Sequence, residues 1–241
     1  SGSGGGVAAN ILNKKYEVGI FEKGSYGNGM TNNETFGYHN FYDTNGIQQT
    51  RGYKVLLLAG MGIGGGTSVN WTTSLRTPNQ ILNEWDALTE QDNYFNSHEF
   101  KNSMDYVCKE LNVDIKNNRI PQKEEKLAEG LELNNLSYKI IPRNTSNDEC
   151  TESGFSTFGR YDESINSTNK IWFSEERFEP KNVFSDTNIT SLDLSNGRAT
   201  HINVENNGIL HKVAVDKVVL AAGSLNTPKI LLDSGYKNKH L

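Results

Sequence analysis

The chain has 241 residues, and 35% of them are apolar, which allows one large folded domain or two small ones. Its 24 lysines and arginines against 29 aspartates and glutamates give a formal net charge of −5. This acidic balance, without a basic run, argues against nucleic acid and against an anionic membrane surface as partners. Two cysteines cannot form the disulfide framework of a small secreted domain. No run of about 20 apolar residues could form a transmembrane helix.

The first 24 residues have the pattern of most of a βαβ unit. A glycine-rich opening, residues 1–6, precedes a helical pattern, and residues 16–21 predict a strand that ends at Glu22. The apolar face of that helix would consist of Val7, Ala8, Ile11 and Leu12. The strand expected before the glycines is absent, and the sequence starts without Met inside a glycine run, so we expect a fragment or a processed product.

The middle of the chain is predicted to be polar loop and helix. Residues 25–50 are polar without a period, and residues 54–59 are apolar enough for a short buried segment. Apolar residues recur at helical spacing over residues 97–112 and 123–133, which predicts two helices. Residues 143–168 are polar and turn-rich, and they predict a long loop.

The last third predicts β-structure followed by a helix. Residues 183–194, 199–204 and 210–214 alternate like three strands of a meander, joined by Asn-Gly turns. Residues 216–222 form a continuous apolar run, as expected of a strand that is covered on both faces of its sheet. A helix is expected to begin at residues 227–228, with Pro near its first position.

The opening glycines are the first candidate ligand site. A dinucleotide fingerprint needs glycines for a tight turn, for backbone approach to the pyrophosphate and for close helix packing, and the helix N-terminus then binds phosphate. The candidates are Gly2, Gly4, Gly5 and Gly6. Glu22 ends the next strand, about 20 residues on, where an acid could bind a ribose. The alternative is a flexible tail followed by a surface helix.

Two further glycine-rich segments are candidates. Residues 60–71 hold so many glycines in an apolar setting that the backbone is expected to pass close to something flat or anionic. The alternative there is a buried turn between packed helices. Residues 221–228 end a predicted strand in Gly-Ser and open a helix, which is a common ligand position at the carboxyl edge of a parallel sheet. An ordinary βα turn is the alternative for this segment.

Together these segments resemble the glucose-methanol-choline (GMC) oxidoreductases, a family of FAD-dependent alcohol oxidases and dehydrogenases. Residues 60–70 match the signature G-x-x-[LIV]-G-G-[GST]-[GST]-x-[LIVM]-N, with Met61 where Arg is usual. Residues 223–235 match the start of a second signature, and Tyr236-Lys237 replace its usual aliphatic-Gly end. Within the family the chain is most similar to the long-chain fatty alcohol oxidases, on residues 3–7, 67–71, 141–144 and 224–228.

The resemblance implies an α/β fold. A Rossmann-like FAD/NAD(P)-binding domain with a parallel sheet and a β-meander would comprise residues 1–87 and 179–241. Residues 88–178 would be an inserted helical and loop region. The first β-strand and the C-terminal substrate-binding and catalytic part of the family would be missing from this chain.

The resemblance also implies roles for individual residues. It has Gly2 and Gly5 cradle the FAD pyrophosphate, with Gly223 and Ser224 near it, and it counts Gly4 among the cofactor-binding residues. Glu22 would hold the adenosine ribose, and the backbone of Ile189 would meet the adenine. Beside the flavin it places Gly64, Gly65, Gly66, Thr67 and, near the isoalloxazine, Asn70.

Two departures from the family pattern matter. Long-chain alcohol oxidases carry a stretch of the form C-x-x-C-G-F-C-x-x-G-C, of which only Cys150 is present here, and a single Cys is not a zinc site, so we expect no metal. The family's catalytic His lies well beyond the second signature, whereas this chain ends at Leu241. The chain's own histidines match no such motif, and we name no catalytic base among His39, His98, His201, His211 and His240.

The implied function is FAD-dependent oxidation of alcohols, long-chain alcohols foremost, to aldehydes by hydride transfer to the flavin. The partner would be a small-molecule alcohol, in an intracellular, peroxisomal or membrane-associated setting. Three alternatives stay open: a catalytically inactive FAD-binding remnant, an NAD(P)-linked Rossmann dehydrogenase, and a non-enzymatic binding module with a meander face. The glycines of residues 60–70 would have no role in an NAD(P)-linked enzyme.

Overall fold

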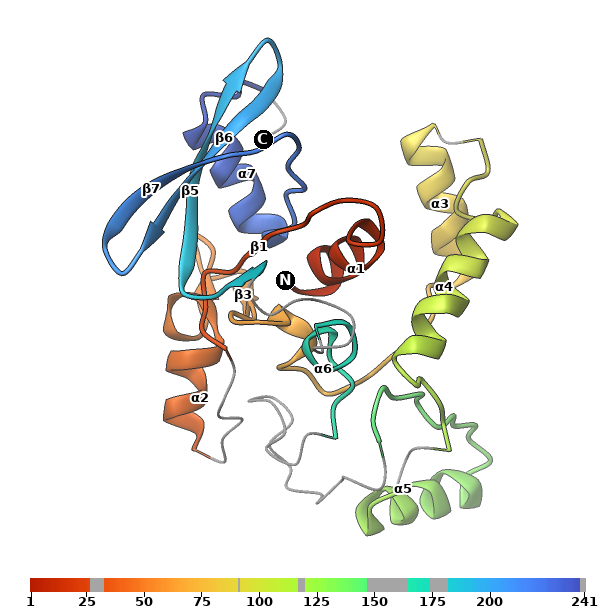
Figure 1. Ribbon diagram of the computed structural model, residues 1–241. Coiled ribbons are helices and arrows are strands. Elements are labelled where there is room, and N and C mark those ends of the chain that lie inside the picture. Colours follow the sequence, from red (N-terminus) through yellow and green to blue (C-terminus); the bar gives the residue numbers. More distant parts are fainter. Residues whose placement is uncertain (27–32, 91, 117–119, 147–163, 174–181, 239–241) are drawn as a thin grey trace. The chain divides into compact units, whose positions relative to one another are not determined.

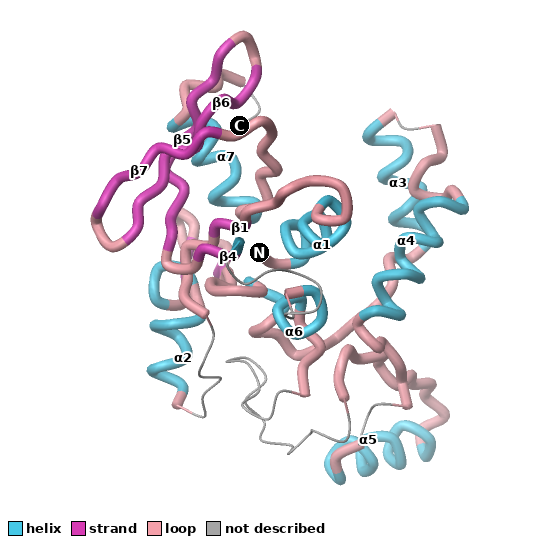
Figure 2. The backbone as a smooth tube through the Cα atoms, in the orientation of Figure 1, coloured by secondary structure: helices cyan, strands magenta, loops and turns pink. Residues whose placement is uncertain are grey.

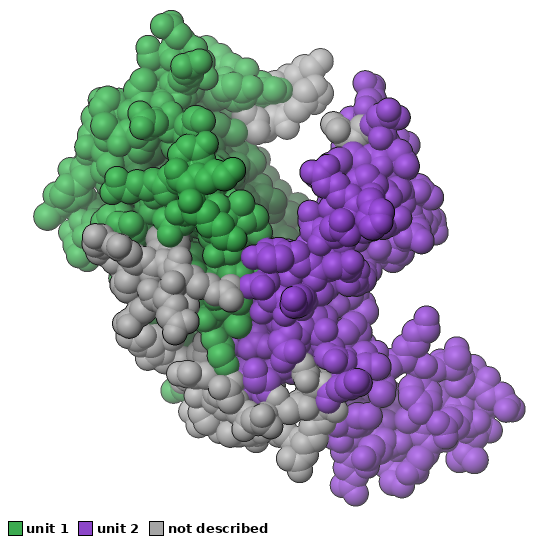
Figure 3. Space-filling model, turned by 45° about the vertical axis from the view of Figure 1, so that its right-hand side comes forward, with its two compact units in different colours: residues 1–70, 153–161, 167–241 green, residues 71–152, 162–166 purple. Residues whose placement is uncertain are grey.

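The computed structural model has a mixed α/β fold (Figure 1). It describes residues 1–26, 33–90, 92–116, 120–146, 164–173 and 182–238. The chain divides into two compact units (Figure 3). Unit 1 contains the described residues of 1–70 and 167–241, and unit 2 contains those of 71–152 and 162–166. The division into an FAD-binding and an inserted domain stays a prediction.

An antiparallel meander is the largest sheet among the described residues and lies in unit 1 (Figure 2). Its strands are β5 (Thr187–Ser195), β6 (Arg198–Asn206) and β7 (Ile209–Ala214). The first turn has φ of 51° at Asn196 and 75° at Gly197, which is the pattern of a type I′ hairpin turn. The predicted meander is confirmed. Its first strand is interrupted at Asp186, where φ is 52°, and this separates β5 from β4 (Val183–Phe184).

Helix α7 (Gly223–Asp233) packs on the meander (Figure 1). The hydrophobic core there combines Leu192, Ile202, Val204 and Ile230. The helix begins before the predicted start, so Pro228 lies inside it and the predicted position of Pro near the first residue is wrong. Pro removes one backbone hydrogen bond, the bond to the carbonyl of Ser224. Ser224 is exposed in the first turn, where water can satisfy that carbonyl, so the helix can continue.

A parallel sheet is present only as one short pair among the described residues. Strand β1 (Ile20–Phe21) pairs in parallel with β4. Residues 216–222, predicted as a buried strand, carry no ladder to any described strand, and the side chain of Val219 is 59% exposed. That prediction is therefore wrong for this structure. A strand is stabilised by its hydrogen-bonded neighbours, and an apolar run alone cannot supply them.

Helix α1 (Ser3–Leu12) confirms the predicted N-terminal helix, but its buried face differs from the predicted one. The buried residues are Gly6, Ala9 and Asn10, whereas Ile11 is exposed. The reason is the helix α6 (Thr168–Trp172), which packs against α1. A Cβ at Gly6 would lie 2.8 Å from the Cβ of Thr168, so the contact face follows the small residue instead of the apolar stripe.

The region predicted as irregular, residues 25–50, contains a helix in its described part. Helix α2 (Glu34–Phe41) begins at Asn33, whose side chain accepts a hydrogen bond from the Phe36 N–H at 3.0 Å. The short turn η1 (Asp43–Asn45) follows, and then the antiparallel pair β2 (Gln48–Gln49) and β3 (Leu56–Leu57). Leu56 is 64% exposed, so the predicted buried segment at residues 54–59 is wrong.

Unit 2 is helical. It contains α3 (Asn79–Thr89), α4 (His98–Glu110) and α5 (Gln122–Leu133), of which α4 and α5 confirm predicted helices. Edge-on contacts between aromatic rings connect α3 to α4 through Trp85, Tyr94, Phe95 and Phe100. Within the described ranges, no helix combines the length and the apolar character that crossing a membrane requires.

Candidate functional site

The first two glycine-rich segments contact each other inside unit 1. A Cβ at Gly2 would lie 3.5 Å from the carbonyl oxygen of Gly64 and 3.6 Å from the Cα of Gly65. The second segment also folds back on itself, since a Cβ at Gly60 would lie 2.6 Å from the Cα and the nitrogen of Gly66. We call this contact the glycine junction and define it as Gly2, Gly60, Gly64, Gly65 and Gly66.

The short turn η2 (Gly65–Thr67) gives the glycine junction its shape. Thr67 Oγ1 donates to the Gly64 carbonyl at 2.6 Å. The amide of Asn70 donates to the carbonyls of Gly66 at 2.9 Å and Thr67 at 2.8 Å. Thr67 and Asn70 are both predicted to lie beside the flavin. Their side chains form hydrogen bonds within the loop and so fix its backbone.

The N-terminus of α1 presents unpaired hydrogen-bond donors. Gly2 is the N-cap residue and offers no side-chain cap, and the first turn contains no acidic side chain. Within the described residues, the N–H groups of Ser3, Gly4 and Gly5 have no acceptor. Such a turn carries partial positive charge and binds anions, phosphates above all.

Glu22 lies at the end of β1, and its carboxylate joins the first two glycine segments. Its Oε2 accepts from Ser1 Oγ at 2.6 Å and from the Ser1 nitrogen at 3.2 Å. Its Oε1 accepts from the N–H of Gly24 at 3.2 Å and of Gly62 at 3.3 Å. A carboxylate accepts about four hydrogen bonds. A ribose hydroxyl at Glu22 would therefore have to replace one of these donors. The Ser1 hydroxyl is the one on a rotatable side chain, and it also accepts from the N–H of Gly64 at 3.0 Å.

Thr168 contacts the segments that form the glycine junction, although nothing in the sequence indicated this role. Its hydroxyl lies 2.9 Å from Thr67 Oγ1 and donates to the Ser1 carbonyl at 3.1 Å, and its N–H donates to Thr67 Oγ1 at 3.1 Å. Its side chain is 1% exposed. The available signal was the N-cap of α6, where Ser167 accepts from the N–H of Lys170, within a stretch predicted as loop.

The third glycine-rich segment reaches the first through Ala221. Cβ atoms at Gly4 and Gly5 would lie 3.6 and 3.4 Å from the Cβ of Ala221, which is ordinary contact. Gly223 and Ser224 follow at the start of α7, and a Cβ at Gly223 would meet nothing within 4 Å. The starts of α1 and α7 are thus brought close together, as the sequence interpretation requires.

Ile189 is placed on the meander, opposite Val204 in β6. Its side chain packs against the meander core, to which Phe21, the residue before Glu22, also belongs. The role of its backbone toward adenine stays a prediction.

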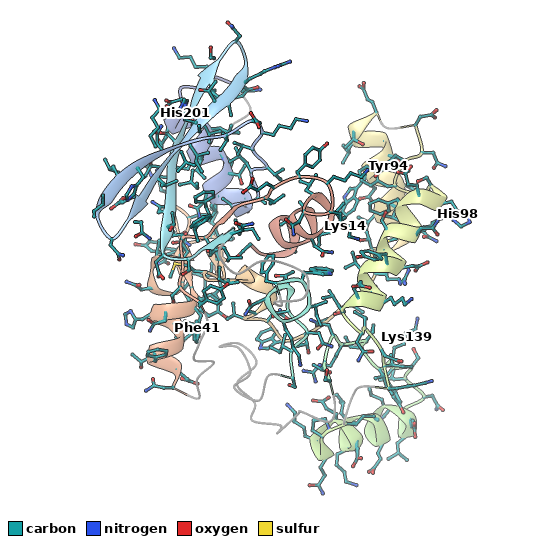
Figure 4. All side chains as sticks on the ribbon, in the orientation of Figure 1. Lys14, Phe41, Tyr94, His98, Lys139 and His201 are labelled. Carbon is teal, nitrogen blue, oxygen red and sulfur yellow. The ribbon has the colours of Figure 1, made fainter. Side chains whose placement is uncertain are left out.

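The described histidines belong to elements other than those that form the glycine junction. His98 is on α4 in unit 2, and His201 is on β6 (Figure 4). His39 on α2 and His211 on β7 are exposed. His240 and the stretch that begins at Cys150 lie outside the described residues.

Comparison with known proteins places the chain in a family. Long-chain-alcohol oxidases FAO4A and FAO4B of Arabidopsis thaliana are 30% and 31% identical to it, over all of this chain and 34% of their own length. The chain thus spans about a third of these relatives. The solved structure of pyridoxine 4-oxidase from Mesorbium loti shares the fold, with a TM-score of 0.55 and 14% identity, over 97% of this chain and 50% of that one. The family model for GMC oxidoreductases matches residues 17–241, so the chain belongs to the GMC oxidoreductases and corresponds to the N-terminal domain of that family.

Proposed function

We propose that this chain binds FAD at the glycine junction and serves as the flavin-binding part of an alcohol oxidase. The observation that carries the proposal is the start of α1. In the described part of the chain the N–H groups of Ser3, Gly4 and Gly5 have no acceptor, and Gly2, which precedes them, lies against the backbone of Gly64 and Gly65. This combination suits a pyrophosphate, because the donors bind its charge and glycine carries no side chain of its own that would oppose its approach.

The geometry of Gly66 supports room for a flat ligand. Gly66 is exposed, its backbone has no positive φ, and a Cβ built there would meet no atom of the described residues within 4 Å. Folding therefore does not require glycine at this position. A ligand that lies against the loop would require it, and the resemblance places the flavin there.

The chain's own residues would bind and orient the cofactor. FAD, when bound, supplies the acceptor for the hydride that leaves the alcohol carbon. The first turn of α1 would hold the pyrophosphate, and Glu22 would exchange its Ser1 hydroxyl for a ribose hydroxyl. We assign the removal of the alcohol proton to none of the described histidines, because none belongs to the glycine junction.

Long-chain alcohols are the proposed substrates, on the strength of the long-chain-alcohol oxidases among the relatives. The test uses the protein as its gene encodes it, with turnover measured as aldehyde formed from 1-hexadecanol and from ethanol. Aldehyde from 1-hexadecanol in clear excess supports the substrate class. Turnover of ethanol alone would contradict it.

Flavin binding is tested by titrating the chain with FAD and following the quenching of flavin fluorescence. We expect saturable binding that Gly66→Asp weakens at least about tenfold, because the new carboxylate meets an anionic ligand. Gly130→Asp is the matched control, since a Cβ at Gly130 in α5 also meets nothing within 4 Å. Equal binding by wild type and Gly66→Asp would place FAD elsewhere. Binding of NAD without FAD, or of neither, would overturn the proposal.

A further inference from the structure

Asp43 is a buried carboxylate at the meeting point of three segments that are far apart in sequence. The residue is 6% exposed. Its Oδ1 accepts from Lys23 Nζ at 2.5 Å and from the N–H of Thr44 at 2.9 Å. Its Oδ2 accepts from the side-chain amide of Asn226 at 3.0 Å. The carboxylate thus joins the end of β1, the turn η1 and the first turn of α7.

Two of these segments, the end of β1 and the first turn of α7, carry or adjoin candidate FAD residues. Lys23 directly follows Glu22, and Asn226 lies in the helical turn that begins with Gly223 and Ser224. The backbone of Asp43 also reaches the start of the second glycine-rich segment, since its N–H donates to the carbonyl of Ala59 at 2.9 Å, one residue before Gly60. Asp43 therefore contacts the third glycine-rich segment, the residue before the second and the residue after Glu22, although no motif contains it.

The contacts require an ionised carboxylate. Burial alone would raise the pKa of Asp43, but the hydrogen bonds from Asn226 and Lys23 outweigh it and hold this pKa below its usual value. A buried charge persists only where it is paired and hydrogen-bonded, as here. A neutral amide at the same place would present a donor to the Lys23 ammonium or to the Asn226 amide, which are donors themselves.

We propose that Asp43 is a positioning residue for FAD, which it does not touch: it fixes the start of α7 against the Glu22 end of β1 and against the glycine junction. The inference rests on the proposed FAD site. Removal of the carboxylate releases α7 from β1, so the pyrophosphate and ribose contacts no longer form together. FAD affinity falls although every residue expected to contact FAD is unchanged.

The test exchanges donor and acceptor in the hydrogen bond between Asn226 and Asp43. In Asp43→Asn, the amide can satisfy either Lys23 or Asn226 but not both, and in Asn226→Asp two carboxylates face each other. In the double variant Asp43→Asn/Asn226→Asp, the amide introduced at position 43 donates to the carboxylate introduced at position 226, while its oxygen accepts from Lys23 and Thr44. We expect each single variant to weaken FAD binding about tenfold and the double variant to recover to within about threefold of wild type.

The measurement is an FAD titration at a temperature at which far-UV circular dichroism shows all variants folded. Asn226→Ala, which leaves the pair of Asp43 and Lys23 intact, should weaken binding as well, because only the tie to α7 is lost. Asp105→Asn is the control, since the exposed pair of Asp105 and Arg76 lies in unit 2 and should leave the affinity unchanged.

The outcomes separate the two proposals. Tight binding by wild type and by Asp43→Asn alike overturns the role of Asp43 and leaves the FAD site standing. Weak binding by the single variants without recovery in the double variant also overturns it, because general loss of structure would then be the cause. Failure of the wild-type chain to bind FAD overturns both.

Discussion

Glycines at the glycine junction and glycines in the meander turns serve opposite physical needs. At Gly60 a Cβ would lie 2.6 Å from the backbone of Gly66, so the position requires the absence of a side chain. At Gly208, in the turn between β6 and β7, φ is 77° and a Cβ would meet nothing within 4 Å, so the position requires only an unusual backbone angle. Gly60 must be glycine because another backbone lies against it, and Gly208 is favoured as glycine by its local backbone conformation.

The largest expected effect comes from adding one methyl group at each place. Gly60→Ala should destabilise the chain by about 3 kcal/mol or more, since the backbone atoms on the other side cannot move without opening the loop. Gly208→Ala should cost about 1–2 kcal/mol, the strain of a left-handed backbone at a residue with a Cβ. Urea unfolding followed by circular dichroism measures both. Equal losses would show that the junction is loosely packed.

A smaller effect tests the buried hydroxyl of the junction against a hydroxyl of the meander. Thr168→Val keeps the shape of the side chain but removes the donor to the Ser1 carbonyl and one of the partners of Thr67 Oγ1, which keeps the Thr168 N–H, at an expected cost of about 1–3 kcal/mol. Thr200→Val on β6 removes the half-buried hydrogen bond to the carbonyl of Asp193 and should cost about 0.5–1.5 kcal/mol. A smaller loss at Thr168 than at Thr200 would contradict the role of Thr168 as a tie between the first two glycine segments.

The same contrast explains what the sequence could predict. The meander follows from local signals: alternation along the strands and Asn-Gly pairs such as Asn196-Gly197, whose backbone angles are set within the turn itself. Helix α4 likewise begins at its own capping residue, Ser97. The glycine-rich motifs could be recognised from the sequence because a dense run of glycines usually marks a close approach of backbone. The spacing of the motifs indicated the family.

The contacts between motifs were not predictable in this way. Thr168 and Asp43 act through partners that are many residues away in sequence, and neither lies in a motif. The apolar run of residues 216–222 shows the opposite error: it has the composition of a strand but pairs with no described strand. Long-range pairing carries no signature in one segment alone, whereas periodicity and turn chemistry do.

The smallest expected effect concerns two aspartates whose pKa is lowered in the folded state. Burial opposes the lowering at Asp43, but hydrogen bonds from Asn226 and Lys23 exceed it. At the surface of the meander, the hydrogen bond from Lys212 lowers the pKa of Asp193. A lowered pKa stabilises the folded state above the unfolded pKa of about 3.9, and this stability is lost as the pH falls through the folded pKa.

The difference in unfolding free energy between wild type and Asp43→Asn should therefore be largest near neutral pH and shrink progressively below about pH 4. Asp193→Asn should follow the same direction with a smaller amplitude, and its effect should vanish in about 1 M salt because the exposed pair is screened. The effect of Asp43→Asn should persist in salt, since that carboxylate is buried. Urea unfolding from pH 7 to pH 3, at low and high salt, separates the two. If salt abolished both effects, the Asp43 contacts would be open to solvent and could not hold α7 in place.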